Sequence, residues 1–240
     1  MQPVIFNLSG ISYRYPGGPL VLDHLDFHLH AGDRIGLVAP NGSGKTTLFH
    51  IIMGLLKPSS GTIEAFGRIR CEEKDFLSVR RRIGLLFQDA DDQLFSPTVI
   101  EDVAFGPLNL GKTRDEAMAV ARQTLDFLGL NGFADRITYK LSGGEKRLVS
   151  LATVLAMQPE VLLLDEPSTG LDADTKATLI GILNRLDLSL VLISHEFDFL
   201  SKATHHIYTM ANGRIRFDQE LVVHTHEHAH AMGQQPHRHE

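Results

Sequence analysis

The sequence predicts an α/β fold built around a mostly parallel sheet. Runs of consecutive apolar residues are typical of strands buried on both faces, and they occur as RIGLVA at 34–39, VLLLD at 161–165 and LVLISH at 190–195. Stretches with helical spacing separate these strands, and that alternation favours parallel pairing. A glycine-rich loop at 39–47 lies between a strand and a helix.

Composition sets bounds on what the chain does. It has 240 residues, 43% of them hydrophobic, and a formal net charge of −6. Nucleic-acid-binding proteins usually present a basic face, so this charge argues against that class as the main task. A single cysteine, Cys71, excludes an internal disulfide and favours a reducing compartment. Since we find neither a signal-peptide pattern nor an apolar run of roughly 20 residues, we expect any membrane role to act through a partner.

The expected elements follow in chain order. LDFHL at 25–29 alternates apolar and polar residues, as a half-buried strand does. A helix follows the glycine-rich loop to about Leu56, and GTIEAFG at 61–67 and RRIGLLFQ at 81–88 are expected to be strands.

The segment from 97 to 130 is expected to be mainly helical. Thr113 and Glu116 form a capping-box pattern, and Gly129 is a plausible helix end. An apolar stripe at helical spacing lies between them, made of Ala117, Val120, Ala121, Leu125 and Leu128. After the strand at 161–165 we expect a helix over 172–186, and Asn212-Gly213 predicts a hairpin near the end.

The loop APNGSGKTT at 39–47 matches the phosphate-binding pattern G-x-x-x-x-G-K-[ST], except that Ala39 replaces the first glycine. One methyl group is tolerable there if the backbone φ is negative. Glycines turn N–H groups toward phosphate oxygens, and the following helix points its positive end at the same place. Lys45 would reach the β- and γ-phosphates, and the Thr46 hydroxyl would bind Mg²⁺.

The strand VLLLD ends in carboxylates at the sheet edge where α/β proteins bind ligands. Asp165 would hold the Mg²⁺ shell, and Glu166 would polarise an attacking water. Together with the phosphate loop, these residues predict a nucleoside-triphosphate hydrolase.

LSGGEKR at 141–147 adds a signature sequence. Together with the motifs above, it makes the chain resemble the ATPase subunit of an ATP-binding-cassette (ABC) transporter over about residues 3–220. The resemblance implies a P-loop NTPase of the ABC-ATPase fold, with an antiparallel β subdomain and a helical insertion. It implies one ABC ATPase domain over 1–223, with a RecA-like core at about 1–90 and 146–223 and a helical subdomain at about 91–145. The polar, histidine-rich composition of 224–240 predicts a disordered tail. ATP and Mg²⁺ are the implied cofactors.

The resemblance also gives a role to the signature. Ser142 can cap a helix whose first turn presents N–H groups to an anion. In the family, two subunits pair head to tail, and each signature (here Ser142, Gly143, Gly144 and Glu145) covers the γ-phosphate held by the other. We expect pairing with an identical copy, although a paralogous partner fits the motifs as well. Glutamine is usual where this chain has Glu145, and arginine is common where it has Leu148.

The remaining roles follow the family by position. Tyr15 resembles the aromatic residue that stacks on adenine, with Tyr13 the second choice. Gln88 resembles the glutamine that contacts Mg²⁺ and the attacking water. Asp172 resembles the acidic residue of the loop between the two subunits. His195 resembles the switch histidine that contacts the γ-phosphate. The expected ATP-binding loop residues are Asn41, Gly42, Ser43, Gly44, Lys45, Thr46 and Thr47.

DADDQLFSPTVIEDVAFGP at 89–107 resembles the ATPases of energy-coupling-factor importers, especially the cobalt and nickel group. This implies membrane coupling and substrate-binding subunits as partners, and a peripheral position on the cytoplasmic face of a bacterial or archaeal membrane. The ATPase of a vitamin-type energy-coupling-factor importer is the alternative.

The last residues of the chain are rich in histidine. Neutral imidazole is a suitable ligand for Ni²⁺ and Co²⁺, so the tail is expected to be either a metal buffer or sensor, or a solvated segment without function. The six histidines concerned are His224, His226, His228, His230, His237 and His239.

Two other function classes fit less well. A nickel-insertion GTPase, which is a metallochaperone, also combines a phosphate loop with a histidine-rich tract, but it reads guanine with an N-K-x-D element that we do not find here. A soluble ABC protein acting on DNA or ribosomes normally carries two cassettes or a long coiled coil, and we find neither pattern in this sequence.

Overall fold

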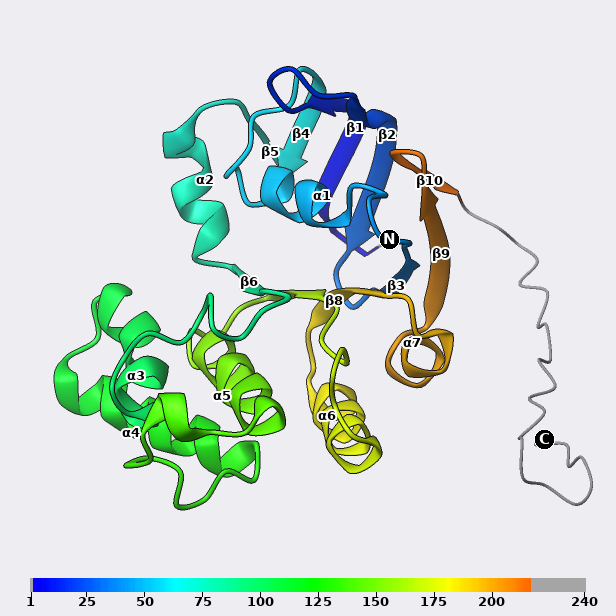
Figure 1. Cartoon of the computed structure of the whole chain (residues 1–240). Helices are drawn as coiled ribbons and strands as arrows, with labels where there is room; N and C mark the ends of the chain where they lie inside the picture. Colours follow the sequence, from blue (N-terminus) through cyan, green and yellow to red (C-terminus); the bar gives the residue numbers. More distant parts are fainter. Residues whose placement is uncertain (1, 217–240) are drawn as a thin grey trace, which may run out of the picture.

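The computed structural model describes residues 2–216, which form two sheets and their covering helices (Figure 1). The larger sheet has the order β10-β9-β3-β8-β7-β6, and its strands are parallel except for β10. The strands are β3 (Arg34–Val38), β6 (Ile83–Leu86), β7 (Val161–Asp165), β8 (Ser189–Ser194), β9 (His206–Ala211) and β10 (Arg214–Arg216). The predicted mostly parallel core sheet is therefore confirmed.

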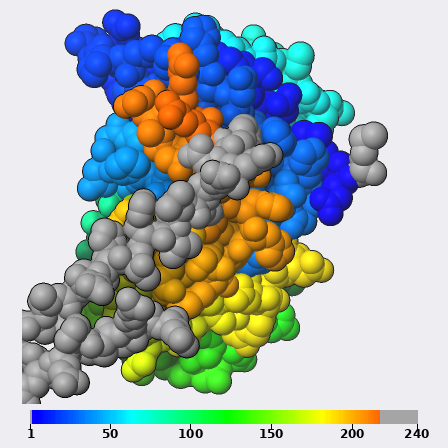
Figure 2. Space-filling model, turned by 90° about the vertical axis from the view of Figure 1, so that its right-hand side faces the viewer, coloured from blue at the N-terminus to red at the C-terminus, as the bar shows by residue number. Residues whose placement is uncertain are grey.

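The smaller sheet is antiparallel, as the resemblance implied, with the order β2-β1-β4-β5. Its strands are β1 (Val4–Arg14), β2 (Leu20–His30), β4 (Ser60–Ala65) and β5 (Arg68–Arg70). The β9–β10 hairpin lies against β2 at the surface (Figure 2). There Arg214 pairs with Asp23 at 2.6 Å. Asn212 and Gly213 both have positive φ, as the predicted tight hairpin turn requires.

The helices cover the larger sheet and extend from it. They are α1 (Lys45–Ile52), α2 (Glu73–Arg80), α3 (Val99–Asn109), α4 (Arg114–Phe127), α5 (Gly143–Leu155), α6 (Ala173–Arg185) and α7 (Phe197–Ala203), with one 3₁₀ turn at Thr138–Lys140. In Figure 1, α3, α4 and α5 lie together, away from the antiparallel sheet. Within residues 2–216 no helix is both long and apolar enough to cross a membrane.

Both faces of the parallel sheet are buried. Neighbouring residues on one strand point to opposite faces, so Leu163 and Val191 pack toward α1 and the antiparallel sheet. Leu162 and Leu190 pack toward the helices on the other side. This explains why the strands appear in the sequence as continuous apolar runs.

The helix after the phosphate loop was predicted too long, because it ends at Ile52 rather than near Leu56. Gly54 follows with φ of +67°, and a Cβ atom there would lie 2.1 Å from the Phe76 ring. A bend with close packing therefore ends the helix. The predicted Thr113–Glu116 capping box is present at the start of α4, and Gly129 follows its end with φ of +74°.

Candidate functional site

The phosphate loop connects β3 to α1 at the carboxyl edge of the parallel sheet. Gly42 and Gly44 have φ of +79° and +97°, so glycine suits both positions. A Cβ atom on Gly44 would also lie 2.8 Å from Leu22. Ala39 is fully buried and is not among the residues with positive φ. Alanine therefore meets the backbone condition that the sequence analysis set for it.

Lys45 lies at the first position of α1 and is nearly buried, with 6% of its surface exposed. Its Nζ donates to Asn41 Oδ1 at 3.2 Å and forms an ion pair with the Glu166 carboxylate. The loop thus holds its cation over the place where an anion would enter.

Glu166 directly follows β7 and is 1% exposed. Its φ of +48° is uncommon for a residue with a side chain, and such strain tends to gather at functional sites. One carboxylate oxygen contacts Lys45, and the other lies 2.9 Å from His195 Nδ1. Because 60% of the His195 side chain is exposed, it links the buried carboxylate to the surface.

Thr46 and Asp165 lie beside this pair. The Thr46 hydroxyl donates to Asp165 Oδ2 at 2.7 Å, while Asp165 Oδ1 is buried without a hydrogen-bond partner among the described residues. Burial raises the pKa of Asp165, opposed by the Thr46 hydrogen bond and by Lys45. Oxygen ligands with one unsatisfied carboxylate oxygen suit a hard divalent cation such as Mg²⁺.

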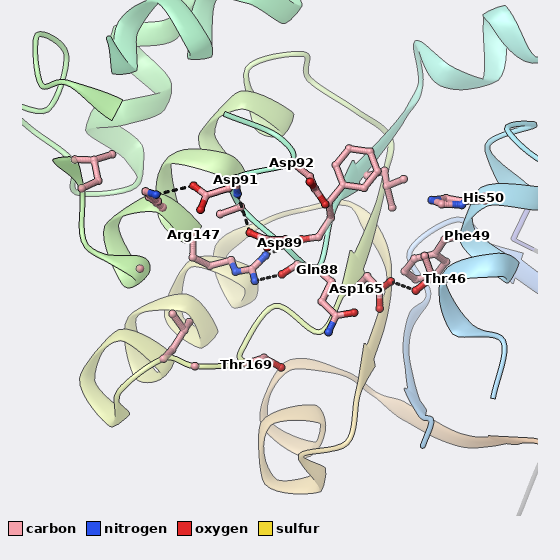
Figure 3. A pocket seen from close by; sticks show the side chains of 18 residues that line it. Thr46, Phe49, His50, Gln88, Asp89, Asp91, Asp92, Arg147, Asp165 and Thr169 are labelled. Atoms are coloured by element: carbon pink, nitrogen blue, oxygen red, sulfur yellow. Dashed lines mark hydrogen bonds and ion pairs between the residues drawn. The ribbon is translucent and has the colours of Figure 1, made fainter. Parts of the chain in front are cut away.

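A cavity of about 760 Å³ opens next to these oxygens (Figure 3). Gln88, Thr46 and Asp165 line it, and so does Gly143 from the start of α5. The structure therefore brings the loop that contains Gln88 (the glutamine loop), the expected Mg²⁺ ligands and one signature glycine to one cavity. Ser142, Gly144 and Glu145 are not among the residues that line it.

Arg147 anchors the glutamine loop and was missed from the sequence. Arg147 is 5% exposed, and its guanidinium donates to the backbone oxygens of Phe87, at 2.6 Å, and Gln88 (Figure 3). Burial lowers the pKa of this guanidinium, opposed by the nearby charges of Asp89 and Asp165. The sequence held a hint of this role, because Arg147 lies one position before Leu148, where arginine is common in the family.

Tyr15 is much more exposed than Tyr13. The Tyr15 ring is 43% exposed, and its hydroxyl lies 3.1 Å from the hydroxyl oxygen of Thr47 in the phosphate loop. Tyr13 is 8% exposed and packs edge-on against Tyr15, with ring centroids 5.0 Å apart. Tyr15 thus offers an accessible face next to the loop.

The signature begins α5 as predicted. Ser142 is the N-cap, and its Oγ accepts from the Glu145 N–H at 3.3 Å. Glu145 accepts in return from the Ser142 N–H at 2.8 Å and pairs with Arg136 at 2.8 Å. Gly144 leaves room for α6, because a Cβ atom there would lie 3.2 Å from Thr175.

Asp172 caps α6 and accepts from the Thr175 N–H at 2.9 Å, a bond that lowers the pKa of Asp172.

A second network, missed from the sequence, lies next to His195. The Glu196 carboxylate accepts from the Ser168 hydroxyl at 2.8 Å and pairs with Lys176 at 2.5 Å. It therefore ties the segment after β8 to the loop before α6.

The six tail histidines lie outside the described residues. Within residues 2–216, no group of three or more histidine, cysteine, aspartate and glutamate side chains is arranged to hold a metal ion.

Sequence comparison identifies close relatives. The ABC transporter family profile matches residues 22–169. An ABC transporter ATP-binding protein of Nitratidesulfovibrio vulgaris is 49% identical over 236 residues, covering 98% of this chain and 86% of that protein. The energy-coupling factor transporter ATP-binding protein EcfA of Methanocaldococcus jannaschii is 40% identical over 215 residues, covering 88% of this chain and 77% of that protein.

A solved structure shares both the fold and part of the sequence. CbiO1 from Clostridium perfringens, part of the ABC transporter complex CbiONQ, superposes with a TM-score of 0.81 at 32% identity. The match covers 90% of this chain and 88% of CbiO1.

Proposed function

Because the chain belongs to the ATP-binding subunits of ABC transporters, we propose that it powers the import of a nickel or cobalt ion through a membrane partner. It is an ATP hydrolase, and its relatives include energy-coupling-factor ATPases. The proposal also includes the cargo, the partners, the roles of single residues and the position on the cytoplasmic face of the membrane.

In this proposal the phosphate loop binds ATP through its backbone N–H groups and Lys45. Thr46, Gln88 and Asp165 would hold Mg²⁺, which supplies neutralisation of phosphate charge when bound. Glu166 orients the attacking water and accepts its proton, which is the role of a general base. His195 holds Glu166 in place at 2.9 Å and presents its exposed ring to the γ-phosphate side.

The pairing part of the proposal concerns the start of α5. Ser142 caps this helix, so the N–H groups of Gly143 and Gly144 are available to an anion at its positive end. An identical copy placed head to tail would bring these groups onto the γ-phosphate of the first copy. ATP would then stabilise the pair, and hydrolysis would release it.

An exposed aromatic patch supports a membrane partner. We define it as Phe95, Phe105 and Tyr139, which are 66%, 45% and 73% exposed. Phe95 and Phe105 pack edge to face, with centroids 4.8 Å apart. Exposed aromatic clusters of this kind mark protein contact sites. The patch lies on and next to the 89–107 segment.

The observation that carries the cargo assignment is the resemblance of residues 89–107 to the cobalt and nickel group. The histidine-rich segment 224–239 agrees with it, since imidazole suits both ions. A vitamin-type importer shares only the general resemblance to energy-coupling-factor ATPases, and the histidines favour the metal.

The test is uptake of metal ions by cells that express the chain together with the membrane subunits encoded next to it. We expect uptake of radioactive Ni²⁺ or Co²⁺ that is lost with Lys45→Ala, because this change removes the phosphate-loop cation. Asp198→Asn, which alters an exposed α7 pair with Lys202, is the matched control. Lys45-dependent uptake of a vitamin without metal uptake would contradict the proposed cargo.

A further inference from the structure

The carboxylate of Glu145 is held between two donors at the start of α5. One oxygen accepts from the Ser142 N–H and the other from Arg136 Nη1, both at 2.8 Å. The Glu145 and Arg136 side chains are 33% and 48% exposed. This ion pair therefore lies at the accessible end of the signature helix.

Glu145 carries its negative charge at neutral pH. The Ser142 backbone hydrogen bond lowers the pKa of Glu145, with further contributions from the Ser142 side chain and Arg136. A carboxylate suits a helix N-terminus, yet here it is next in sequence to Gly143 and Gly144, whose N–H groups would receive a phosphate. Left without a cation, it would repel the same anion.

Arg136 is held in position to supply that cation. Its guanidinium carbon lies 3.6 Å from the centroid of the Phe133 ring, in cation–π geometry. Its backbone oxygen accepts from the Val99 N–H at the start of α3. The basic residues that follow Glu145 have other partners, because Lys146 pairs with Asp91 and Arg147 binds the glutamine loop.

We propose that Arg136 is a positioning residue for ATP-driven pairing, which neutralises Glu145 so that the signature accepts the partner copy's γ-phosphate. Where family members have glutamine, no charge needs neutralising. The inference rests on the head-to-tail pairing in the proposed function.

The experiment measures pairing of the full chain by analytical ultracentrifugation in ATP, with every variant built on Glu166→Gln to slow hydrolysis. We expect Arg136→Ala to raise the dimer dissociation constant roughly three- to tenfold, because the dimer contains two such sites and each contributes a partly exposed charge effect. In the Glu145→Gln background, adding Arg136→Ala should change the dimer dissociation constant less than twofold. High salt should reduce the difference in this dissociation constant between Arg136→Ala and its parent.

Three controls separate this role from a structural one. Arg136→Lys keeps the charge and should restore most of the pairing. Arg214→Ala removes another half-exposed pair, with Asp23, and should leave pairing unchanged. Binding of a fluorescent ATP analogue to the unpaired chain should be the same with and without Arg136→Ala, since the signature acts on the partner's nucleotide.

Equal loss of pairing from Arg136→Ala, with or without Glu145→Gln, would overturn the inference in favour of a structural role. Pairing that is insensitive to Arg136→Ala would overturn it while leaving the proposed function intact. If ATP does not pair the parent chain at all, both the proposed pairing and this inference are wrong.

Discussion

The ammonium of Lys45 is bound directly to the carboxylate of Glu166, although 120 residues separate them in the chain. One group would hold phosphate and the other would activate water. A γ-phosphate that binds Lys45 would therefore compete with Glu166 for the ammonium. In the proposed function, this competition would couple the arrival of substrate to the release of the base.

Glu166→Gln tests this relationship. The amide keeps the size of the side chain but cannot accept a proton, so we expect turnover to fall at least about a hundredfold. ATP binding should be retained or tightened, because the amide competes less well for Lys45. Steady-state ATPase assays and equilibrium binding measure the two effects.

Glu160→Gln is the matched control, since Glu160 precedes the same strand and pairs with Arg82 at its opposite end. Glu160→Gln should leave ATP turnover nearly unchanged. If Glu166→Gln also keeps near-normal turnover, Glu166 is not the general base.

Tyr15→Ala should raise the KM for ATP with a smaller change in kcat. Loss of a base-stacking ring costs about 1–3 kcal/mol, which corresponds to roughly 5- to 150-fold in affinity. Tyr15→Phe keeps the ring and removes only the contact with Thr47, so it should behave almost as the parent does. If both variants raise KM equally, the hydroxyl contact rather than stacking is responsible.

Asp165→Asn should stabilise the chain while removing Mg²⁺-dependent turnover. Burial raises the pKa of Asp165 in the folded chain, so the stability contributed by its protonated form is present at low pH and is lost as pH rises through the folded pKa. Asparagine removes the ionised carboxylate, and we expect a melting temperature higher by roughly 2–4 °C at neutral pH.

The measurement is thermal unfolding of ATP-bound protein with and without Mg²⁺. Added Mg²⁺ should stabilise the parent more than it stabilises Asp165→Asn, because the variant keeps only Thr46 and Gln88 as expected ligands. An equal gain in stability in both proteins would exclude Asp165 as a ligand. Asp198→Asn on the surface serves as the reference.

Much of this fold could be predicted because its signals are local. The Ser142 and Thr113 caps and the Asn212-Gly213 turn each lie within a few residues of sequence, and the parallel strands are continuous apolar runs. The predicted roles of the phosphate-loop and strand-end residues also depended on local motifs.

What the sequence analysis missed depends on contacts between distant segments. The end of α1 is set by the ring of Phe76 against Gly54, and Arg147 binds backbone oxygens 59 and 60 residues earlier. Helix α2 was overlooked because only Phe76 and Val79 in it are buried, too few to form an apolar stripe. Such pairings become visible only when the chain is folded.

Thr113→Ala tests one local signal. It removes the side-chain acceptor at the start of α4, so we expect a loss of about 1 kcal/mol and a melting temperature lower by roughly 2–4 °C. ATPase activity at low temperature should be unchanged. Thr124→Ala in the same helix is the control, because its hydroxyl bonds only the Val120 carbonyl four residues back. Equal losses from the two variants would argue against the cap.

The histidines of the tail give a prediction that does not depend on its structure. Replacing His224, His226, His228, His230, His237 and His239 with glutamine keeps length and polarity but removes the imidazole ligands. We expect weaker Ni²⁺ and Co²⁺ binding by calorimetry, while the ATPase rate stays the same, because the phosphate loop and Glu166 are untouched. Deleting 224–240 should give the same result. Unchanged metal binding in the glutamine variant would show that the tail is not the ligand set and would withdraw its support for a metal cargo.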